Sequence, residues 1–299
     1  VPVLASDEEV LSGKRFDALA ADELVALYRL MARLELATPR RRTRRAQRAR
    51  RGEHVDLRRT LRGSLRTGGD PIRLAHRRRR VTRRRLVLLC DISGSMEPYA
   101  RAYLQFLTCA GGNAEAFVFA TRLTRITRAL ATRNPDRALR RAAAAAPDWS
   151  SGTRIGDALR AFNDHHGRRG MARGAVVVIL SDGWERGDPA LVAREMARLS
   201  RLAYRIVWVN PRVSAQGFVP RAGGMAAALP YCDALVSGHS LEALGEVVDA
   251  IAAERAGKLE PPEPESEEEP WASATPQPGS SVAMPSGYGP SRGRTTPGW

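Results

Sequence analysis

The stretch LVLLCDISGSME, residues 86–97, decides the fold. Its first five residues are mostly apolar, as in a strand that is buried on both faces of a parallel sheet. Asp91 ends this run, and Ser93 and Ser95 follow on either side of Gly94. Oxygen-bearing side chains just past a buried strand indicate a ligand-binding loop, because ligands of open α/β sheets bind beside the carboxyl ends of the strands.

Downstream of this stretch, strand patterns alternate with helix patterns, which predicts an α/β fold with a doubly wound, mainly parallel sheet and helices on both faces. GAVVVILSD (174–182) is an apolar strand that ends in polar residues. DPALVAREMARLSRL (188–202) is a predicted helix, with Asp188 as its cap and Pro189 in its first turn. Further strands are expected at 114–120, 123–127, 204–211 and 233–238, and further helices at 22–36, 99–110, 134–146, 155–162 and 241–255.

Three polar clusters interrupt the apolar pattern: DISGS (91–95), SSGTRIGD (150–157) and SDGWERGD (181–188). Since the carboxyl ends of parallel strands meet in one crevice, we expect five side chains to converge there: Asp91, Ser93, Ser95, Thr153 and Asp182. Carboxylate and hydroxyl oxygens are hard ligands, which suit Mg²⁺ or Mn²⁺ better than Zn²⁺. Gly94 is expected to let the first loop bend.

The order D-x-S-x-S, a later Thr and a later S-D-G resembles the metal-ion-dependent adhesion site (MIDAS) of von Willebrand factor A (VWA) domains, whose fold is Rossmann-like. Within that superfamily, RRTLRGSLRTGGDP (58–71), LVLLCDISGSM (86–96) and the run from NP (210–211) through GMAAALP to GHSLEAL (238–244) resemble the CoxE-like proteins. The resemblance covers about residues 15–256.

The resemblance implies that Ser93, Ser95 and Thr153 supply hydroxyl oxygens to Mg²⁺. Asp91 and Asp182 would act through bridging waters or hydrogen bonds, and a carboxylate of a partner protein would complete the coordination. It also implies a non-enzymatic adaptor that acts with a MoxR-type AAA+ ATPase. The client would be a metalloenzyme such as a molybdenum-containing carbon monoxide dehydrogenase-like enzyme, matured or remodelled in the cytoplasm.

The positive charge of the chain is concentrated in one segment. The formal net charge is +16, and residues 40–85 alone hold 20 arginines, no lysine and three acids, which gives that segment +17. Such a segment binds anionic surfaces. We expect an acidic protein partner; the alternative is a nucleic-acid-binding protein that carries a VWA domain, with RNA or DNA on these arginines.

The sequence predicts three regions: a helical, arginine-rich segment (1–84), the VWA domain (85–256) and a disordered tail rich in Pro, Glu, Ser and Gly (257–299). The first residue is Val1, so we expect a trimmed fragment. The longest apolar run, 175–180, is too short to span a membrane. Three scattered cysteines indicate reduced thiols, as in a cytoplasmic protein: Cys90, Cys109 and Cys232.

Enzymatic alternatives have weaker support in the sequence. Ser93 or Ser95 could be a nucleophile, but no G-x-S-x-G elbow is present, and His165 and His166 are expected to be solvated. The sequence contains no G-x-x-x-x-G-K-[ST] loop for ATP. A Mg²⁺-dependent hydrolase stays open as a third hypothesis.

Overall fold

The computed structural model describes residues 7–34, 36–69, 73–108, 114–130, 152–214, 223–255 and 257–259. These residues all belong to one compact unit, Val1–Pro262. The predicted helix at 134–146, Cys109 and the tail from residue 260 lie outside the described residues. Cys90 and Cys232 are buried free thiols.

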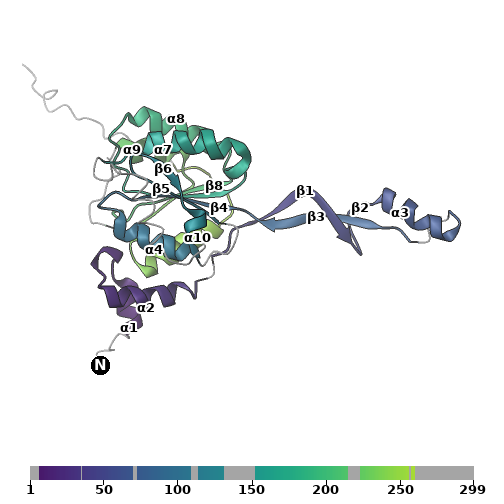
Figure 1. Cartoon of the computed structure of the whole chain (residues 1–299), viewed down its shortest axis with the longest axis horizontal. Helices are drawn as coiled ribbons and strands as arrows, with labels where there is room; N and C mark the ends of the chain where they lie inside the picture. Colours follow the sequence, from purple (N-terminus) through teal and green to yellow (C-terminus); the bar gives the residue numbers. More distant parts are fainter. Residues whose placement is uncertain are drawn as a thin grey trace, which may run out of the picture. The chain divides into compact units, whose positions relative to one another are not determined.

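A six-stranded sheet forms the centre of the unit, in the order β6-β5-β4-β7-β8-β9 (Figure 1). Neighbouring strands are parallel except for β5 and β6, so the predicted doubly wound, mainly parallel sheet is confirmed. The strand order reverses between β4 and β7, and this reversal opens a crevice at their carboxyl ends. The strands are β4 (Leu86–Asp91), β5 (Ala114–Phe119), β6 (Leu123–Arg125), β7 (Val176–Leu180), β8 (Arg205–Val209) and β9 (Ala234–Val236).

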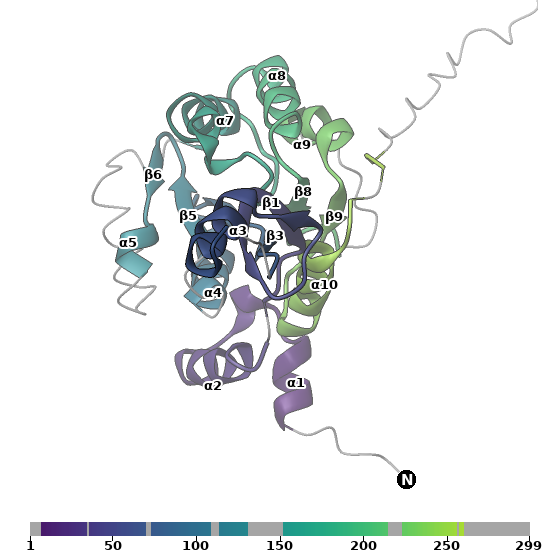
Figure 2. The same cartoon turned by 90° about the vertical axis from the view of Figure 1, so that its right-hand side faces the viewer.

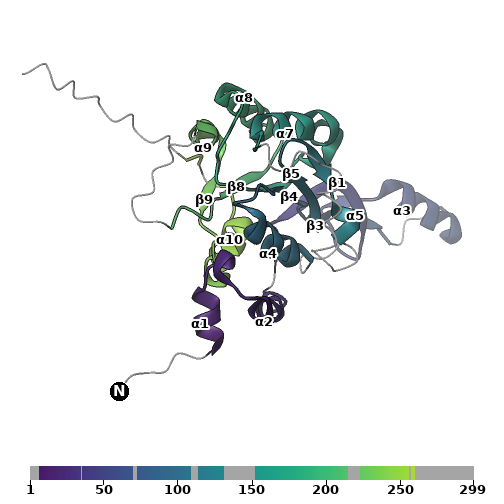
Figure 3. The same ribbon diagram turned by 60° about the vertical axis from the view of Figure 1, so that its left-hand side comes forward.

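Helices cover both faces of this sheet, as Figure 3 shows. The central strands β4, β7 and β8 are buried along their whole length, so successive side chains enter two separate cores. One face carries α4 (Glu97–Thr108) and α10 (Leu241–Ala252); the other carries α7 (Ile155–Phe162), α8 (Pro189–Ser200) and α9 (Gly223–Ala228). The shorter elements are α5 (Thr127–Leu130), η3 (Asn163–Met171) and η4 (Leu229–Tyr231).

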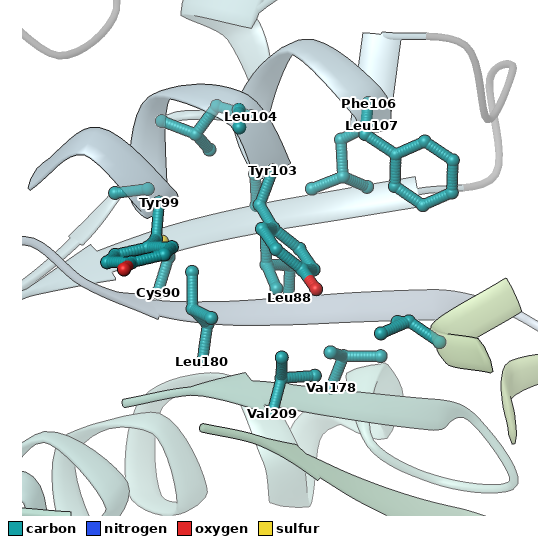
Figure 4. Packing of buried hydrophobic residues seen from close by; sticks show 14 of the residues in the cluster. Leu88, Cys90, Tyr99, Tyr103, Leu104, Phe106, Leu107, Val178, Leu180 and Val209 are labelled. Atoms are coloured by element: carbon teal, nitrogen blue, oxygen red, sulfur yellow. The ribbon is translucent and has the colours of Figure 1, made fainter. Parts of the chain in front are cut away.

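The core under α4 consists of aromatic and aliphatic side chains (Figure 4). Tyr99 and Tyr103 of α4 point toward the sheet, where they meet side chains such as Leu88 of β4 and Val209 of β8. The hydroxyl of Tyr103 donates to the carbonyl oxygen of Gly238 over 3.1 Å, so this buried polar group is satisfied.

The start of α8 follows the predicted capping pattern. The carboxylate of Asp188 accepts a hydrogen bond from the backbone N–H of Ala190 over 2.8 Å, and Pro189 is the first helical residue. These interactions satisfy free donors at the helix start. They fix the point at which the loop after β7 ends.

The amino-terminal helices pack on the core of the large sheet instead of standing apart from it. These elements are α1 (Asp7–Gly13), η1 (Phe16–Ala18) and α2 (Ala21–Met31). The ring of Phe16 is buried at 6.4 Å from the rings of both Tyr99 and Tyr103, and Leu27 and Met31 are fully buried in the same cluster. Residues 7–36 therefore share the core of the region that we expected to start at residue 85.

Residues 40–83, which we call the arginine arm, contain a separate small sheet in the order β1-β3-β2. Figure 2 shows the arm end on, with α3, β1 and β3 labelled. We expected a helical segment, but only its middle is helical, because β1 and β3 pair antiparallel along most of their length. Almost all of their side chains are exposed on both faces, so no apolar alternation marked them as strands. The elements are β1 (Arg40–Ala49), β2 (His54–Val55), α3 (Leu57–Ser64), η2 (Leu65–Thr67) and β3 (His76–Arg83).

The base of the arm is fixed at the amino-terminal edge of the large sheet. The backbone N–H of Arg84 donates to the carbonyl oxygen of Pro39 over 2.9 Å, so the chain enters and leaves the arm at one point. The guanidinium of Arg84 lies 3.4 Å from the ring centroid of Tyr204 and donates to the carbonyl oxygen of Gly174. The arm therefore joins the sheet at the amino-terminal ends of the strands, opposite to their carboxyl ends.

The last described residues still contact the domain. Lys258 forms an ion pair with the buried Asp233, and the N–H of Leu259 donates to the carbonyl oxygen of Cys232 over 3.0 Å. Residues 258 and 259 thus contact the domain, although we expected the domain to end before residue 257. Among the described helices, none combines the length and the apolar character needed to cross a bilayer.

Candidate metal centre

The five predicted site residues come together at the carboxyl ends of β4 and β7. Asp91 is the last residue of β4, and Asp182 lies two residues beyond the end of β7, its direct neighbour in the sheet. Ser93 and Ser95 lie in the loop from β4 to α4, and Thr153 precedes α7. The strand reversal between β4 and β7 thus places three loops around one crevice.

Asp91 is the buried centre of the cluster, with no exposed surface. Its Oδ1 accepts hydrogen bonds from the backbone N–H of Ser93 over 2.9 Å and from the hydroxyl of Thr153 over 3.3 Å. Its Oδ2 accepts a hydrogen bond from the hydroxyl of Ser181 over 2.9 Å. A buried carboxylate with these donors is held in one orientation.

Asp182 is the second carboxylate of the cluster. Its Oδ2 accepts a hydrogen bond from the hydroxyl of Ser95 over 3.3 Å, and its Oδ1 accepts one from the N–H of Trp184 over 3.1 Å. The guanidinium of Arg212 is 3.6 Å from Oδ2. Each carboxylate therefore bonds to at least one serine of the first loop.

The electrostatics of the cluster favour a bound cation. The pKa of Asp91 is raised to about 6: burial is the largest cause and the negative charge of Asp182 adds to it, while hydrogen bonds from Ser93 and Ser181 act in the opposite direction. A positive ion beside the Asp91 carboxylate would stabilise its ionised form.

Glycines shape two of the three loops. Gly183 has φ +80°, and a Cβ there would lie 2.4 Å from the Cβ of Met225. Gly152 has φ +92°, and a Cβ there would overlap the side chain of Arg186. Gly94 differs from our expectation: it does not have a positive φ, and a Cβ would meet nothing within 4 Å. Glycine is thus required after β7 and before α7, but not at position 94.

Ser181 is a functional residue that our set of five omitted. It is fully buried, donates to Asp91 and accepts a hydrogen bond from the N–H of Gly183 over 3.1 Å. Its backbone carbonyl accepts from the indole N–H of Trp208. Ser181 is part of the S-D-G triplet. The sequence alone does not tell whether a serine at the end of a strand binds a ligand or positions a neighbouring side chain.

The donor set fits a hard divalent cation. It offers two carboxylates and several hydroxyls. Among the described residues, no metal site built from three or more His, Cys, Asp or Glu side chains is found elsewhere. This composition suits Mg²⁺ or Mn²⁺, which take oxygen ligands and retain water. His166, the candidate base for a serine nucleophile, packs instead against Phe117 and Phe162, with the ring centroids 4.8 and 6.2 Å apart. His165 is exposed, as expected.

Trp184 borders the crevice. It lies in the loop after Asp182, and its side chain is 66% exposed. An exposed tryptophan beside a candidate metal site provides apolar contact area for a partner protein. The structure thus favours a rim position for Trp184 over simple packing.

Comparison with known proteins gives one family match. The model of the family described as VWA domain containing CoxE-like protein matches residues 27–244. No curated protein matches the chain. A structure of proximal thread matrix protein 1 from the mussel byssus shares 16% identity with a TM-score of 0.37, and the match covers 56% of this chain and 47% of that chain.

A second structure of the same mussel protein, described with a zinc-occupied MIDAS motif, shares 15% identity with a TM-score of 0.36 over 56% of this chain and 47% of that chain. The chain thus spans about half the length of these structures, and the similarity is too low to support any inference about function.

Proposed function

This chain belongs to the family of VWA domain-containing CoxE-like proteins, and from that premise we propose that it is a non-enzymatic, Mg²⁺-dependent adaptor between proteins. The family membership supports protein interaction as its role. The joined cluster of Asp91, Asp182 and their serine and threonine partners supports the metal as the point of contact.

In this proposal, Ser93, Ser95 and Thr153 hold the metal through hydroxyl oxygens, and the two carboxylates orient them or bind through water. Mn²⁺ would fit the same ligands. Hydroxyl and water ligands leave most of the positive charge of the ion uncompensated, so an incoming Asp or Glu side chain is strongly attracted. A bound ion would supply a coordination position for that carboxylate; Arg212, 3.6 Å from Oδ2 of Asp182, and the exposed Trp184 would be available to contact the same partner.

The proposed partners are a MoxR-type AAA+ ATPase and a metalloenzyme client, such as a molybdenum-containing carbon monoxide dehydrogenase-like enzyme. The adaptor would present the client to the ATPase during maturation or remodelling, in the cytoplasm. The support for these partners is the CoxE-like family alone.

The test is binding to a purified MoxR-type ATPase in Mg²⁺ and in EDTA. We expect binding in Mg²⁺ that EDTA or Asp91→Asn lowers by at least about tenfold. Asp157→Asn is the matched control, because Asp157 lies on α7 and pairs with Arg160 at the surface over 2.6 Å. Equal binding by the wild type and the Asp91 variant, with Mg²⁺ present, would show that the metal centre does not mediate the contact.

A further inference from the structure

Helix α3 of the arginine arm has its apolar side chains on the outside. Thr60 and Ser64 are buried, and the hydroxyl oxygen of Thr60 accepts a hydrogen bond from the N–H of Ala75 over 3.0 Å, which holds the helix against the return of the chain to β3. The leucines face the solvent. The exposed fractions are 69% for Leu57, 63% for Leu61 and 78% for Leu65.

Leu57 and Leu61 lie four residues apart on α3, and Leu65 is the first residue of η2, which follows α3 directly with helical backbone angles, so the three leucines form one stripe. A fourth exposed leucine, Leu74, lies in the chain that packs beside α3 (56% exposed). Among the described residues, these four are all of the strongly exposed leucines. Concentrated exposed apolar area of this kind marks a binding surface.

Exposed arginines flank the leucine stripe. Arg58, Arg59, Arg62 and Arg66 are exposed, and none of them forms an ion pair within the described part of the chain. A hollow of about 600 Å³ lies next to α3, and Arg59 lines it together with three further arginines: Arg48, Arg50 and Arg73. Guanidinium groups bind phosphate oxygens in pairs of hydrogen bonds.

The combination of the leucine stripe and the arginines indicates which kind of anionic partner the arm binds. Nucleic acid offers phosphates but nothing for exposed leucines, and residues 40–85 contain no Phe, Tyr or Trp on which a base could stack. A protein groove is typically centred on aromatic anchors, whereas leucine is under-represented at such centres. An anionic bilayer surface offers acyl chains for the leucines and lipid phosphates for the arginines.

We propose that α3 and its flanking arginines form a peripheral membrane-binding site for anionic phospholipids. Leu57, Leu61 and Leu65 insert at the boundary between headgroups and acyl chains. The surrounding arginines and the hollow bind the phosphates. The arm joins the sheet at the edge opposite to the metal centre, so a membrane-bound arm would leave the metal centre open to a protein partner.

Co-sedimentation of the full chain with vesicles tests this site. We expect binding to vesicles in which about a third of the lipid is phosphatidylglycerol, and none to pure phosphatidylcholine vesicles. Changing Leu57, Leu61 and Leu65 together to Ser should raise the lipid concentration for half-maximal binding at least about tenfold. Val10→Ser with Val25→Ser is the matched control, because these valines are exposed on α1 and α2, outside the arm.

Parallel titrations with a short DNA duplex and with poly-glutamate separate the other anionic partners. Loss of vesicle binding by the triple variant, with its far-UV circular dichroism and any DNA binding kept, supports the proposal. Absence of binding to anionic vesicles, or unchanged binding by the triple variant, overturns it. Binding to DNA or poly-glutamate alone would return the arm to the nucleic-acid or acidic-protein hypothesis.

Discussion

The hydroxyl of Ser181 donates to the carboxylate of Asp91 over 2.9 Å, so a hydrogen bond links the carboxyl end of β4 to the residue that follows β7. Both residues are fully buried. This bond fixes the distance between the two loops that carry the remaining candidate ligands. The geometry of the metal centre is therefore set by the sheet beneath it.

Two substitutions at Asp91 should separate metal binding from stability. Asp91→Asn keeps an oxygen that accepts from Ser93 and Thr153, and the Ser181 hydroxyl can turn to accept from the new amide. We expect this variant to lose Mg²⁺ binding, measured by calorimetry, with little change in the thermal midpoint. Asp91→Ala leaves three donors unsatisfied and should also lose about 1–3 kcal/mol of unfolding free energy. Equal stability of the two variants would contradict this account.

The stability of the metal-free protein should decrease as the pH rises from about 4 to about 6. The pKa of Asp91 is raised from 3.8 to about 6 in the folded protein. In this window the folded protein keeps a proton that the unfolded chain has released, so deprotonation costs up to about 3 kcal/mol of unfolding free energy. Urea unfolding in EDTA, compared between wild type and Asp91→Asn, isolates this contribution, because the variant lacks it.

The same carboxylate should make metal binding pH-dependent. Mg²⁺ competes with the proton on Asp91, so below pH 6 the apparent affinity should fall by up to about tenfold per pH unit. Calorimetric titrations between about pH 5 and about pH 8, a range that includes the pKa of Asp91, would measure the slope. A flat profile would show that Asp91 does not have to be ionised for the metal to bind.

Glycine substitutions in two loops should differ in their effect on stability. Gly183→Ala introduces a Cβ where φ is +80° and Met225 is 2.4 Å away, so we expect a loss of about 1–3 kcal/mol and weaker metal binding. Gly94→Ala meets nothing within 4 Å and should change stability by less than about 0.5 kcal/mol. Thermal unfolding of both variants compares them directly. A damaging Gly94→Ala would restore the bending role that we expected from the sequence.

The end of the described chain should contribute to stability, whereas the tail beyond it should not. Deleting residues 260–299 should leave the thermal midpoint nearly unchanged, because a segment rich in Pro, Glu and Ser buries little apolar surface. Lys258→Met should lower stability by about 1–3 kcal/mol, because the buried Asp233 loses its cationic partner. A larger loss from the deletion than from the substitution would show that the tail docks on the domain.

The sequence predicted the sheet and the convergence of the five candidate ligands, because both depend on local patterns; metal binding by these residues stays a prediction. Runs such as VVVIL in β7 are buried on both faces, and the loops after such strands must meet. The arginine arm could not be predicted in this way, because strands without an apolar face carry no alternation. Position 94 was misjudged, because a glycine in a turn motif does not reveal its φ angle.

The packing of Phe16 against Tyr99 and Tyr103 was equally hidden from sequence reasoning. A single aromatic residue between two short helices has no period, and contacts over more than 80 positions leave no local trace. We expected a separate amino-terminal region because its residue composition differs from that of the following region. The extent of the core is determined by side-chain contacts, which composition does not reveal.

The hydrogen bond between Arg84 and Pro39 closes the arm at its root, so residues 40–83 are an insertion whose two ends nearly touch. Insertions with adjacent ends can be shortened, lengthened or exchanged without changing the fold that carries them. Joining residue 39 to residue 84 through a brief turn should therefore leave the large sheet and its helices as a domain of their own, and a different insertion could be grafted at the same place. The arm and the candidate metal centre could then change independently of each other during evolution.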